Sequence, residues 1–236
     1  MTSAASRFYA RSHLINQNPG DSSKPADTRN VLGNLGKAEH RYHCVYRYLS
    51  DNPGRNVVEL GFGNPEIPNA LASLCGTYHI VDIVDRRREA SSPQNLSFTA
   101  ADLNDDFPFA DKQFDDSIAM MVIEHLFDPF HSFREIALIT RNGGRVLVNL
   151  PNIASIKCRV QLLAGNMPVT SSPDWFEKQE WDGNHLHNFT VGDTLRLASK
   201  TGLKIERIFP VGKLIGWKRL WPSLLCHEVS YQFIRE

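Results

Sequence analysis

The stretch NVVELGFG, residues 56–63, decides the fold of this chain. Its first five residues form a short, mostly apolar run, which is typical of a parallel strand covered on both faces. Gly61 and Gly63 follow directly, and a glycine turn at the carboxyl end of a first strand lets a ligand approach the backbone. Two glycines alone also fit a simple tight turn. A binding site can therefore be inferred only if the neighbouring segments provide further evidence for it.

Short apolar runs and helical patterns alternate on either side of this stretch. The apolar runs lie at 78–83, 96–99, 115–123, 145–150, 203–209 and 227–234. Helical spacing occurs at 37–50, from Asp128-Pro129 to the glycines at 143 and 144, and from the capping box Thr190-x-x-Asp193 to Gly202. Strands that alternate with helices imply right-handed crossovers, so the sequence predicts an α/β fold with a doubly wound sheet.

Two segments break this alternation. Residues 1–29 are rich in Ser, Pro, Asp and Asn without periodicity, which predicts a mobile arm. The stretch 151–189 contains several prolines and glycines together with Trp175, Phe176 and Trp181. Long irregular insertions in compact domains tend to be lids or binding loops, and these aromatic rings could stack on a sugar or cover the sheet edge. We expect a lid here.

The composition excludes several classes of protein. Lys+Arg and Asp+Glu number 26 each, so the formal net charge is zero and no basic footprint for nucleic acid is present. The four cysteines contain no C-x-x-C pair, which indicates neither a zinc site nor a disulfide framework. The sequence has neither an apolar run of the roughly 18 residues that a membrane helix needs nor a signal-peptide pattern. We therefore expect a cytoplasmic protein with no nucleic-acid partner and no membrane span.

Asp82 supplies an acid at the end of the apolar run that follows the glycine turn. A carboxylate there can accept both hydroxyls of a ribose. With this acid, the sequence resembles the class I S-adenosylmethionine-dependent methyltransferases. The matching segments are VVELGFG, HIVDI, Ala101-Asp102-Leu103, FPFADKQFD, MMVIEHLFDP and RNGGRVLVNLPN, in this order over residues 56–152. The resemblance implies a Rossmann-like sheet of seven mostly parallel strands with one antiparallel strand, and S-adenosylmethionine as the cofactor.

The resemblance also implies roles for the first two motifs. Gly61 and Gly63 would let the backbone lie against the methionine portion and the ribose of the cofactor. Glu59 would organise the loop or reach the cofactor's amino group. Asp82 would bind the ribose hydroxyls, and Asp85 takes this role if the second strand is longer.

The adenine would be held by the residues that follow. Ile83 would flank the ring, Leu103 would pack on it, and Asp102 would accept a hydrogen bond from its exocyclic amine. A helix cap or turn acid is the alternative role for Asp102. Glu124, at the end of the fourth predicted strand, is counted with the cofactor-binding residues.

The glycine loop departs from the family pattern at Pro65. The family commonly has Gly-x-Gly-x-Gly, whereas residues 61–65 are Gly-Phe-Gly-Asn-Pro. Proline removes a backbone donor and fixes φ, and Pro68 follows closely. We therefore expect a longer, stiffer loop with the helix starting near Pro68. The departure also leaves open a non-catalytic protein that binds no cofactor.

Histidines are the candidates for proton transfer. His125 lies beside the expected methyl group, and an unperturbed pKa near 6.5 suits a general base; the alternative is a residue that supports the strand end. His187, in NHLHNFT, is the second candidate. Asp182, His185 and His187 are close in sequence, but three possible ligands within one loop are a sparse pattern, and we predict no metal site from it.

These observations lead to one functional prediction and two alternatives. We expect residues 30–236 to form a single domain, with a cofactor half at 55–150, an acceptor lid at 151–190, and a helix and strands at 191–236. The segments RVQLLAG, NHLHNFT and LASKTGLKIERI resemble the acceptor half of bacterial enzymes that methylate small molecules. The predicted reaction is methyl transfer to a small-molecule acceptor, a hydroxyl of a sugar, glycan or natural product. A nicotinamide-dependent dehydrogenase and a pseudo-methyltransferase binding module are the alternatives.

Overall fold

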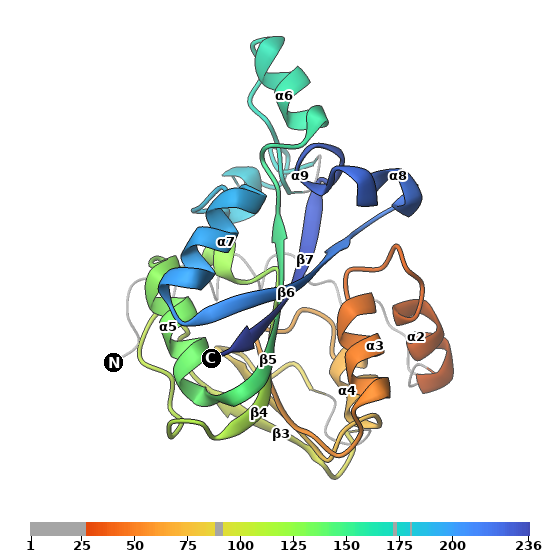
Figure 1. The fold of residues 1–236 in the computed structure, drawn as a ribbon, viewed down its shortest axis with the longest axis vertical. Helices are drawn as coiled ribbons and strands as arrows, with labels where there is room; N and C mark the ends of the chain where they lie inside the picture. Colours follow the sequence, from red (N-terminus) through yellow and green to blue (C-terminus); the bar gives the residue numbers. More distant parts are fainter. Residues whose placement is uncertain (1–26, 88–91, 172–173, 180) are drawn as a thin grey trace.

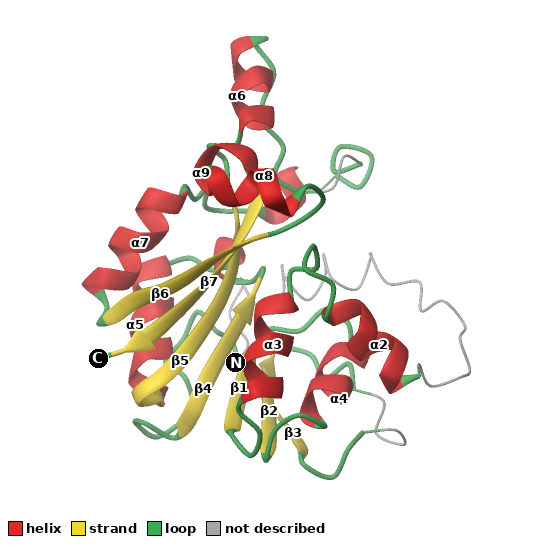
Figure 2. Cartoon of the chain, turned by 45° about the vertical axis from the view of Figure 1, so that its right-hand side comes forward, coloured by secondary structure: helices red, strands yellow, loops and turns green. Residues whose placement is uncertain are grey.

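Seven strands form one mixed sheet in a computed structural model, which describes residues 27–87, 92–171, 174–179 and 181–236. The strands are β1 (Asn56–Leu60), β2 (Thr77–Asp82), β3 (Leu96–Ala100), β4 (Phe114–Met120), β5 (Thr140–Pro151), β6 (Leu203–Pro210) and β7 (Glu228–Arg235). Their order is β3-β2-β1-β4-β5-β7-β6. Figure 1 shows the whole fold, and the strand order can be followed in Figure 2. The first five strands are parallel, and β7 runs antiparallel between β5 and β6. The predicted fold is confirmed.

Helices cover both faces of this sheet (Figure 2). One face carries α2 (Thr28–Leu35), α3 (His43–Asp51) and α4 (Glu66–Ala72), and the other carries α5 (Pro129–Ile139) and α7 (Val191–Lys200). Each face has its own buried apolar cluster, which includes Leu49 and Ile80 on the first face and Phe133 and Val148 on the second. The apolar runs of the sequence are buried because both faces of the strands are covered.

Three further helices lie beyond the carboxyl ends of the parallel strands. They are α6 (Ile156–Leu163), which projects from the body of the molecule, α8 (Ile215–Leu220) and α9 (Pro222–Leu225) (Figure 1). The predicted lid, residues 151–190, thus contains the helix α6, which begins at the N-cap Ser155, and the short 3-10 helix η3 (Trp181–Asn184).

The N-terminal residues of the described chain are helical. The predicted arm ended at residue 29, and its residues 1–26 lie outside the described chain. α2 begins at Thr28, because the side chain of Asp27 caps it and accepts from the amide of Arg29 at 3.0 Å.

The helix after the glycine loop starts earlier than predicted. α4 begins at Glu66 with Pro65 as its N-cap, and the φ of Pro65 is −64°. Pro68 therefore occupies the third helical position, where a backbone N–H has no partner within the helix. Its missing donor removes no helical hydrogen bond, so the expectation of a start near Pro68 was wrong.

The strand β4 and the helix α5 both end before their predicted limits. β4 ends at Met120, because Met121 has a φ of +57° and turns the chain into the 3-10 helix η2 (Ile123–His125). α5 ends at Ile139, and the hydroxyl of Thr140 donates to the carbonyl of Ile136 at 2.6 Å. The glycines at 143 and 144, at which this helix was expected to end, therefore do not cap α5.

Candidate functional site

A pocket opens at the carboxyl ends of the parallel strands. Its lining consists of Gly61, Phe62, Gly63, Asp82, Ile83, Val84, Arg86, Asp102, Leu103, Asn104, Met120, Met121, Val122, His125 and Leu126. These residues follow β1, β2, β3 and β4. The helices after β1 and β4 leave on opposite faces of the sheet, and open α/β sheets bind ligands in the crevice at such a position.

The glycine turn after β1 brings the backbone close to its neighbours. Gly61 has a φ of +70°, and a Cβ atom there would lie 2.7 Å from Cγ2 of Val122. Its amide donates to the carbonyl of Val81 at 2.7 Å, which fastens the turn to β2. Gly63 has no atom within 4 Å of the position of an added Cβ. The first glycine is thus required by packing, whereas the second borders open space.

Asp82 ends β2 and lies on the pocket wall. Its Oδ2 accepts from the amide of Phe62 at 3.0 Å and from Nη1 of Arg86 at 3.1 Å, and its Oδ1 accepts from the amide of Val84 at 3.2 Å. Arg86 also donates to the carbonyl of Phe62 at 3.0 Å. The carboxylate and Arg86 together hold the glycine turn against the end of β2.

Asp85, the alternative to Asp82, is turned to a different partner. Its carboxylate accepts from the guanidinium of Arg87 through both oxygens, at distances from 2.8 to 3.2 Å, and this pairing holds its pKa below the ordinary value. Asp85 does not belong to the pocket lining. Asp82 is therefore the acid that the pocket presents.

Asp102 makes the contacts of a turn acid and also lies in the pocket lining. Its Oδ1 accepts from the amide of Asn104 at 3.0 Å and from the Asn104 side chain at 2.9 Å, as in a turn, while the residue lines the pocket. The Oδ1 of Asn104 in turn accepts from the amide of Phe127 at 2.8 Å. Leu103 beside it is buried and faces the same pocket.

Glu59 lies behind the pocket and outside its lining. It is fully buried, and its two carboxylate oxygens accept from the hydroxyls of Tyr42 at 2.7 Å and Tyr78 at 2.8 Å. Burial raises the pKa of Glu59 to about 7. Of its two expected roles, the organisation of the loop fits these contacts, and a contact with the cofactor's amino group stays a prediction.

Glu124 also lies outside the pocket lining, contrary to its assignment to the cofactor site. Its side chain is fully buried, and neither carboxylate oxygen has a hydrogen-bond partner among the described residues. Burial raises the pKa of Glu124 to about 8, in spite of the nearby Arg41. Its backbone carbonyl accepts from the amides of Leu186 at 2.8 Å and His187 at 3.2 Å. η2 is thus tied to the returning part of the lid.

The two histidines predicted as bases occupy different places. His125 lines the pocket, and its Nδ1 lies 3.2 Å from the carbonyl oxygen of Asn184. His187 is not in the lining, and its Nε2 lies 3.1 Å from the carbonyl oxygen of Phe127. Of the two candidates, only His125 faces the pocket.

Several pocket residues were missed in the sequence. Arg86 is the most consequential of them, since it contacts both Asp82 and the glycine turn. The signal that could have indicated Arg86 was its position four residues after Asp82. Met121 and Val122 carried no such signal, because their position depends on the left-handed backbone of Met121.

Comparisons with known proteins agree with this geometry. Residues 58–148 match the family model described as a methyltransferase domain. These residues are similar to a methyltransferase domain. The curated protein YafE of Escherichia coli K12, described as uncharacterized, is 25% identical over 149 residues, which are 62% of this chain and 65% of that protein. The matched region is thus slightly less than two thirds of that relative.

Solved structures share the fold of residues 58–148 and of the strands that follow them. An S-adenosylmethionine-dependent methyltransferase from Mesorhizobium loti has a TM-score of 0.63 at 17% identity, over 85% of this chain and 99% of that one. The magnesium protoporphyrin IX methyltransferase of Synechocystis PCC 6803, with bound SAH, has a TM-score of 0.62 at 14% identity, over 98% and 96%. The fold that the predicted methyltransferase class implies is confirmed. Within the described ranges, no helix is both long and apolar enough to cross a membrane.

Proposed function

We propose that this chain transfers the methyl group of S-adenosylmethionine to a hydroxyl of a small molecule, such as a sugar, a glycan or a natural product. The observation that carries the proposal is the pocket at the carboxyl ends of β1 to β4. It brings together the glycine turn, two acids and a histidine in one lining, and these are the groups that the cofactor's ribose, adenine and reacting methyl group would need.

Each predicted cofactor residue in the lining keeps its role in this proposal. Gly61 and Gly63 present backbone to the methionine portion, and Asp82 accepts from the ribose hydroxyls. Ile83, Asp102 and Leu103 form the adenine position. A carboxylate accepts hydrogen bonds only, which suits both the ribose hydroxyls and the adenine amine.

The acceptor would enter between the pocket and the returning lid. In the reaction, the acceptor oxygen forms a bond to the methyl carbon as the bond from that carbon to sulfur breaks, which leaves S-adenosylhomocysteine and a methyl ether. The hydroxyl proton passes to Nε2 of His125. Most of the acceleration comes from alignment of acceptor, methyl and sulfur in a site closed to water.

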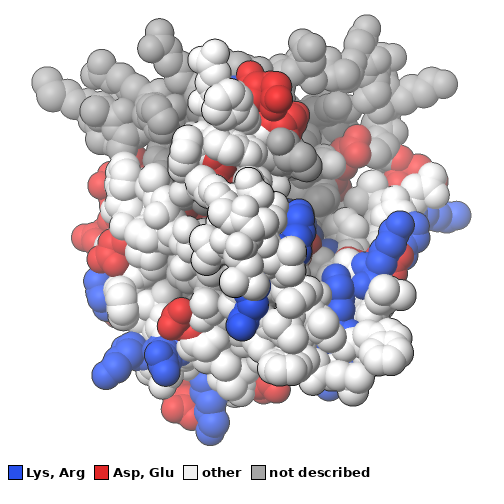
Figure 3. Space-filling view, turned by 90° about the horizontal axis from the view of Figure 1, so that it is seen from above, with Lys and Arg blue, Asp and Glu red and all other residues white. Residues whose placement is uncertain are grey.

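The exposed side chains of the predicted lid fit an organic acceptor of low charge. Figure 3 looks down on the molecule from the end at which α6 projects and shows mainly uncharged side chains in the middle of the view. Phe176 and Trp181 of the lid are 71% and 65% exposed. Exposed aromatic rings near an acceptor site suit the apolar face of a sugar ring.

Calorimetric titration separates this proposal from its two alternatives. We expect the chain to bind S-adenosylmethionine and S-adenosylhomocysteine, and not nicotinamide dinucleotides. A dehydrogenase would show the reverse preference, and a binding module without catalysis would bind neither the cofactor nor a nicotinamide dinucleotide. Transfer of radiolabelled methyl to a panel of sugars and phenols, with amines as the comparison, tests the acceptor class. Methylation of amines alone would contradict the hydroxyl assignment.

A further inference from the structure

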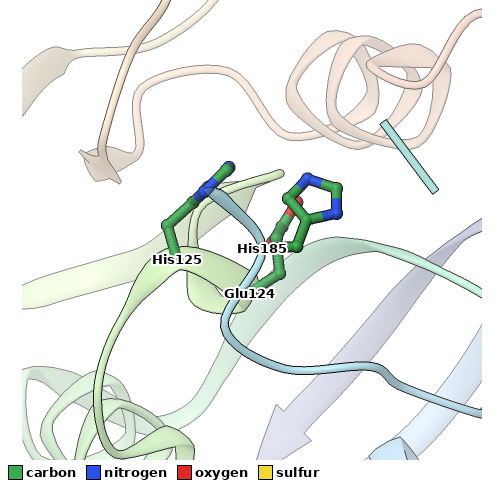
Figure 4. A group of neighbouring side chains, drawn as sticks. All are labelled: Glu124, His125 and His185. Atoms are coloured by element: carbon green, nitrogen blue, oxygen red, sulfur yellow. The ribbon is translucent and has the colours of Figure 1, made fainter. Parts of the chain in front are cut away.

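Three side chains with metal-binding groups converge between η2 and the returning lid. Glu124 and His125 come from η2, and His185 comes from the segment after η3 (Figure 4). One ligand atom of each lies within 4.8 Å of the other two. The rings of His125 and His185 are 4.8 Å apart, edge to face. His185 is distant in sequence from Glu124 and His125, so only the folded chain brings the three side chains together.

The carboxylate of Glu124 needs a partner that the described residues do not supply. It is fully buried, and neither oxygen has a hydrogen-bond partner in the described part of the chain. The guanidinium of Arg41 is paired with Glu228 instead, at 2.9 Å. A buried carboxylate is strongly disfavoured in its charged form unless it is paired or binds a metal. A cation between Glu124 and the two imidazoles would satisfy it.

The hydrogen bonds of His185 place the lone pair of its ring on Nε2. Its Nδ1 lies 2.7 Å from the hydroxyl oxygen of Thr170, and this hydroxyl donates to Oδ2 of Asp182 at 2.8 Å. Because the hydroxyl proton is used on Asp182, Nδ1 carries the ring proton and donates to Thr170. Metal-binding histidines are commonly held in this way by a donor contact of the other ring nitrogen.

His125 has the same arrangement with a backbone partner. Its Nδ1 lies 3.2 Å from the carbonyl oxygen of Asn184, and a carbonyl oxygen only accepts hydrogen bonds. Nδ1 therefore carries the proton in the neutral ring, and Nε2 carries the lone pair. Both rings are thus fixed in the tautomer in which Nε2 can bind a metal.

We propose that Glu124, His125 and His185 bind a divalent first-row transition metal, with Zn²⁺ as the best match. Two imidazoles and one carboxylate suit this class of ion, whereas Mg²⁺ and Ca²⁺ prefer oxygen ligands throughout. Three protein ligands leave at least one position open. Metal bonds of about 2.1 Å place tetrahedral ligand atoms about 3.4 Å apart, so small side-chain rotations complete the site.

The open position faces the place where the acceptor would lie. His125 belongs both to this cluster and to the cofactor pocket. The catalytic role rests on the proposed function: the ion would bind the acceptor oxygen and lower the pKa of its hydroxyl, whose proton leaves to solvent. In the metal-loaded enzyme His125 is a ligand, and the role of base assigned to it above applies only to the metal-free enzyme.

Metal titration of the full chain tests the site without any assay of activity. The chelator-treated protein is titrated with Co²⁺, followed by visible absorption, and then with Zn²⁺ in competition. We expect one equivalent to bind and Glu124→Gln to lower the affinity by more than about 100-fold, since even residues that only orient the ligands change it by 10–100-fold. Thr170→Val, which removes the partner of His185, should lower it by about 10–100-fold.

His131→Ala is the matched control. His131 lies with Asp106 and Glu135 in a second, more exposed cluster, which would also attract ions without any function. Metal binding that is lost in His131→Ala and kept in Glu124→Gln would overturn the proposal, as would the absence of saturable binding. Thr170→Val and His185→Ala keep the test valid if Glu124→Gln does not fold. Titration with S-adenosylhomocysteine in the same variants shows separately whether the cofactor site is intact.

Discussion

Replacement of Asp82 by alanine tests the cofactor pocket at its best-defined contact. In the free protein the carboxylate accepts from two backbone amides, those of Phe62 and Val84, and from Arg86. Two ribose hydroxyls would add two hydrogen bonds to a charged acceptor, each worth roughly 1.5–3 kcal/mol. Competition with Arg86 offsets part of this, so we expect a net loss of about 2 kcal/mol, or roughly 30-fold in the dissociation constant.

Calorimetry with S-adenosylhomocysteine measures this loss, and Asp85→Ala is the matched control. Asp85 is three residues away and carries the same charge, but it faces Arg87 instead of the pocket. Its replacement should change the binding free energy by less than about 0.5 kcal/mol, as for most surface substitutions. A thermal melt of each variant shows that it is folded. If Asp85→Ala weakened binding as much as Asp82→Ala, the placement of the ribose would be wrong.

Arg86→Ala extends the same experiment to a residue that the sequence did not predict. Because Arg86 acts through Asp82 and the glycine turn, its effect should be large in the wild-type background and small when Asp82 is already alanine. The double-mutant cycle reports this dependence as a coupling energy of about 0.5–3 kcal/mol. Additive effects would show that Arg86 acts independently of Asp82.

Three further predictions concern the packing around the site. Gly63→Val should abolish cofactor binding with little change in melting temperature, whereas Gly61→Val should also lower the melting temperature; equal melting temperatures would contradict the packing argument. The raised pKa of Glu59 means that stability falls as pH rises from 4.5 to about 7. Because Tyr42 donates to the charged carboxylate, Tyr42→Phe should lower the free energy of unfolding in urea by about 1–3 kcal/mol more at pH 8 than at pH 5. An equal loss at the two pH values would contradict this role of Tyr42. Amides of residues 156–163 should exchange hydrogen faster than those of the sheet, and slow exchange would show that α6 is not a locally unstable part of the lid.

The fold could be predicted because local patterns determine it. Each apolar run became a strand near its expected limits, and Asp128 and Thr190 cap their helices as their sequences indicate. The predicted limits were wrong where the position of a residue within its helix, or an unexpected backbone conformation, overrode the local sequence pattern. Pro68 is tolerated because it falls in the first turn of α4, and β4 is shortened by the left-handed Met121.

The site was predictable in part for a related reason. Acids and glycines at strand ends face the crevice in any sheet of this kind, so Asp82 could be placed from its spacing and Asp102 from the family resemblance. Glu124 could not, because the direction of its side chain depends on η2 and on the returning lid. His185 likewise reaches Glu124 only through the backbone contacts of residues 184–187 with η2.

The contact between Glu59 and Tyr42 has a consequence for which part of this chain could be exchanged with a relative. The recognisable family segment covers residues 58–148, yet Tyr42 lies before it, and β7, which pairs with β5, lies after it. An exchange of that segment alone between relatives would separate Glu59 from one of its two tyrosine hydroxyls and would give β5 a foreign neighbour. The segment with recognisable similarity, residues 58–148, is therefore smaller than the part of the chain that would have to be exchanged. The residues around Tyr42 before it and β7 after it have to change together with it.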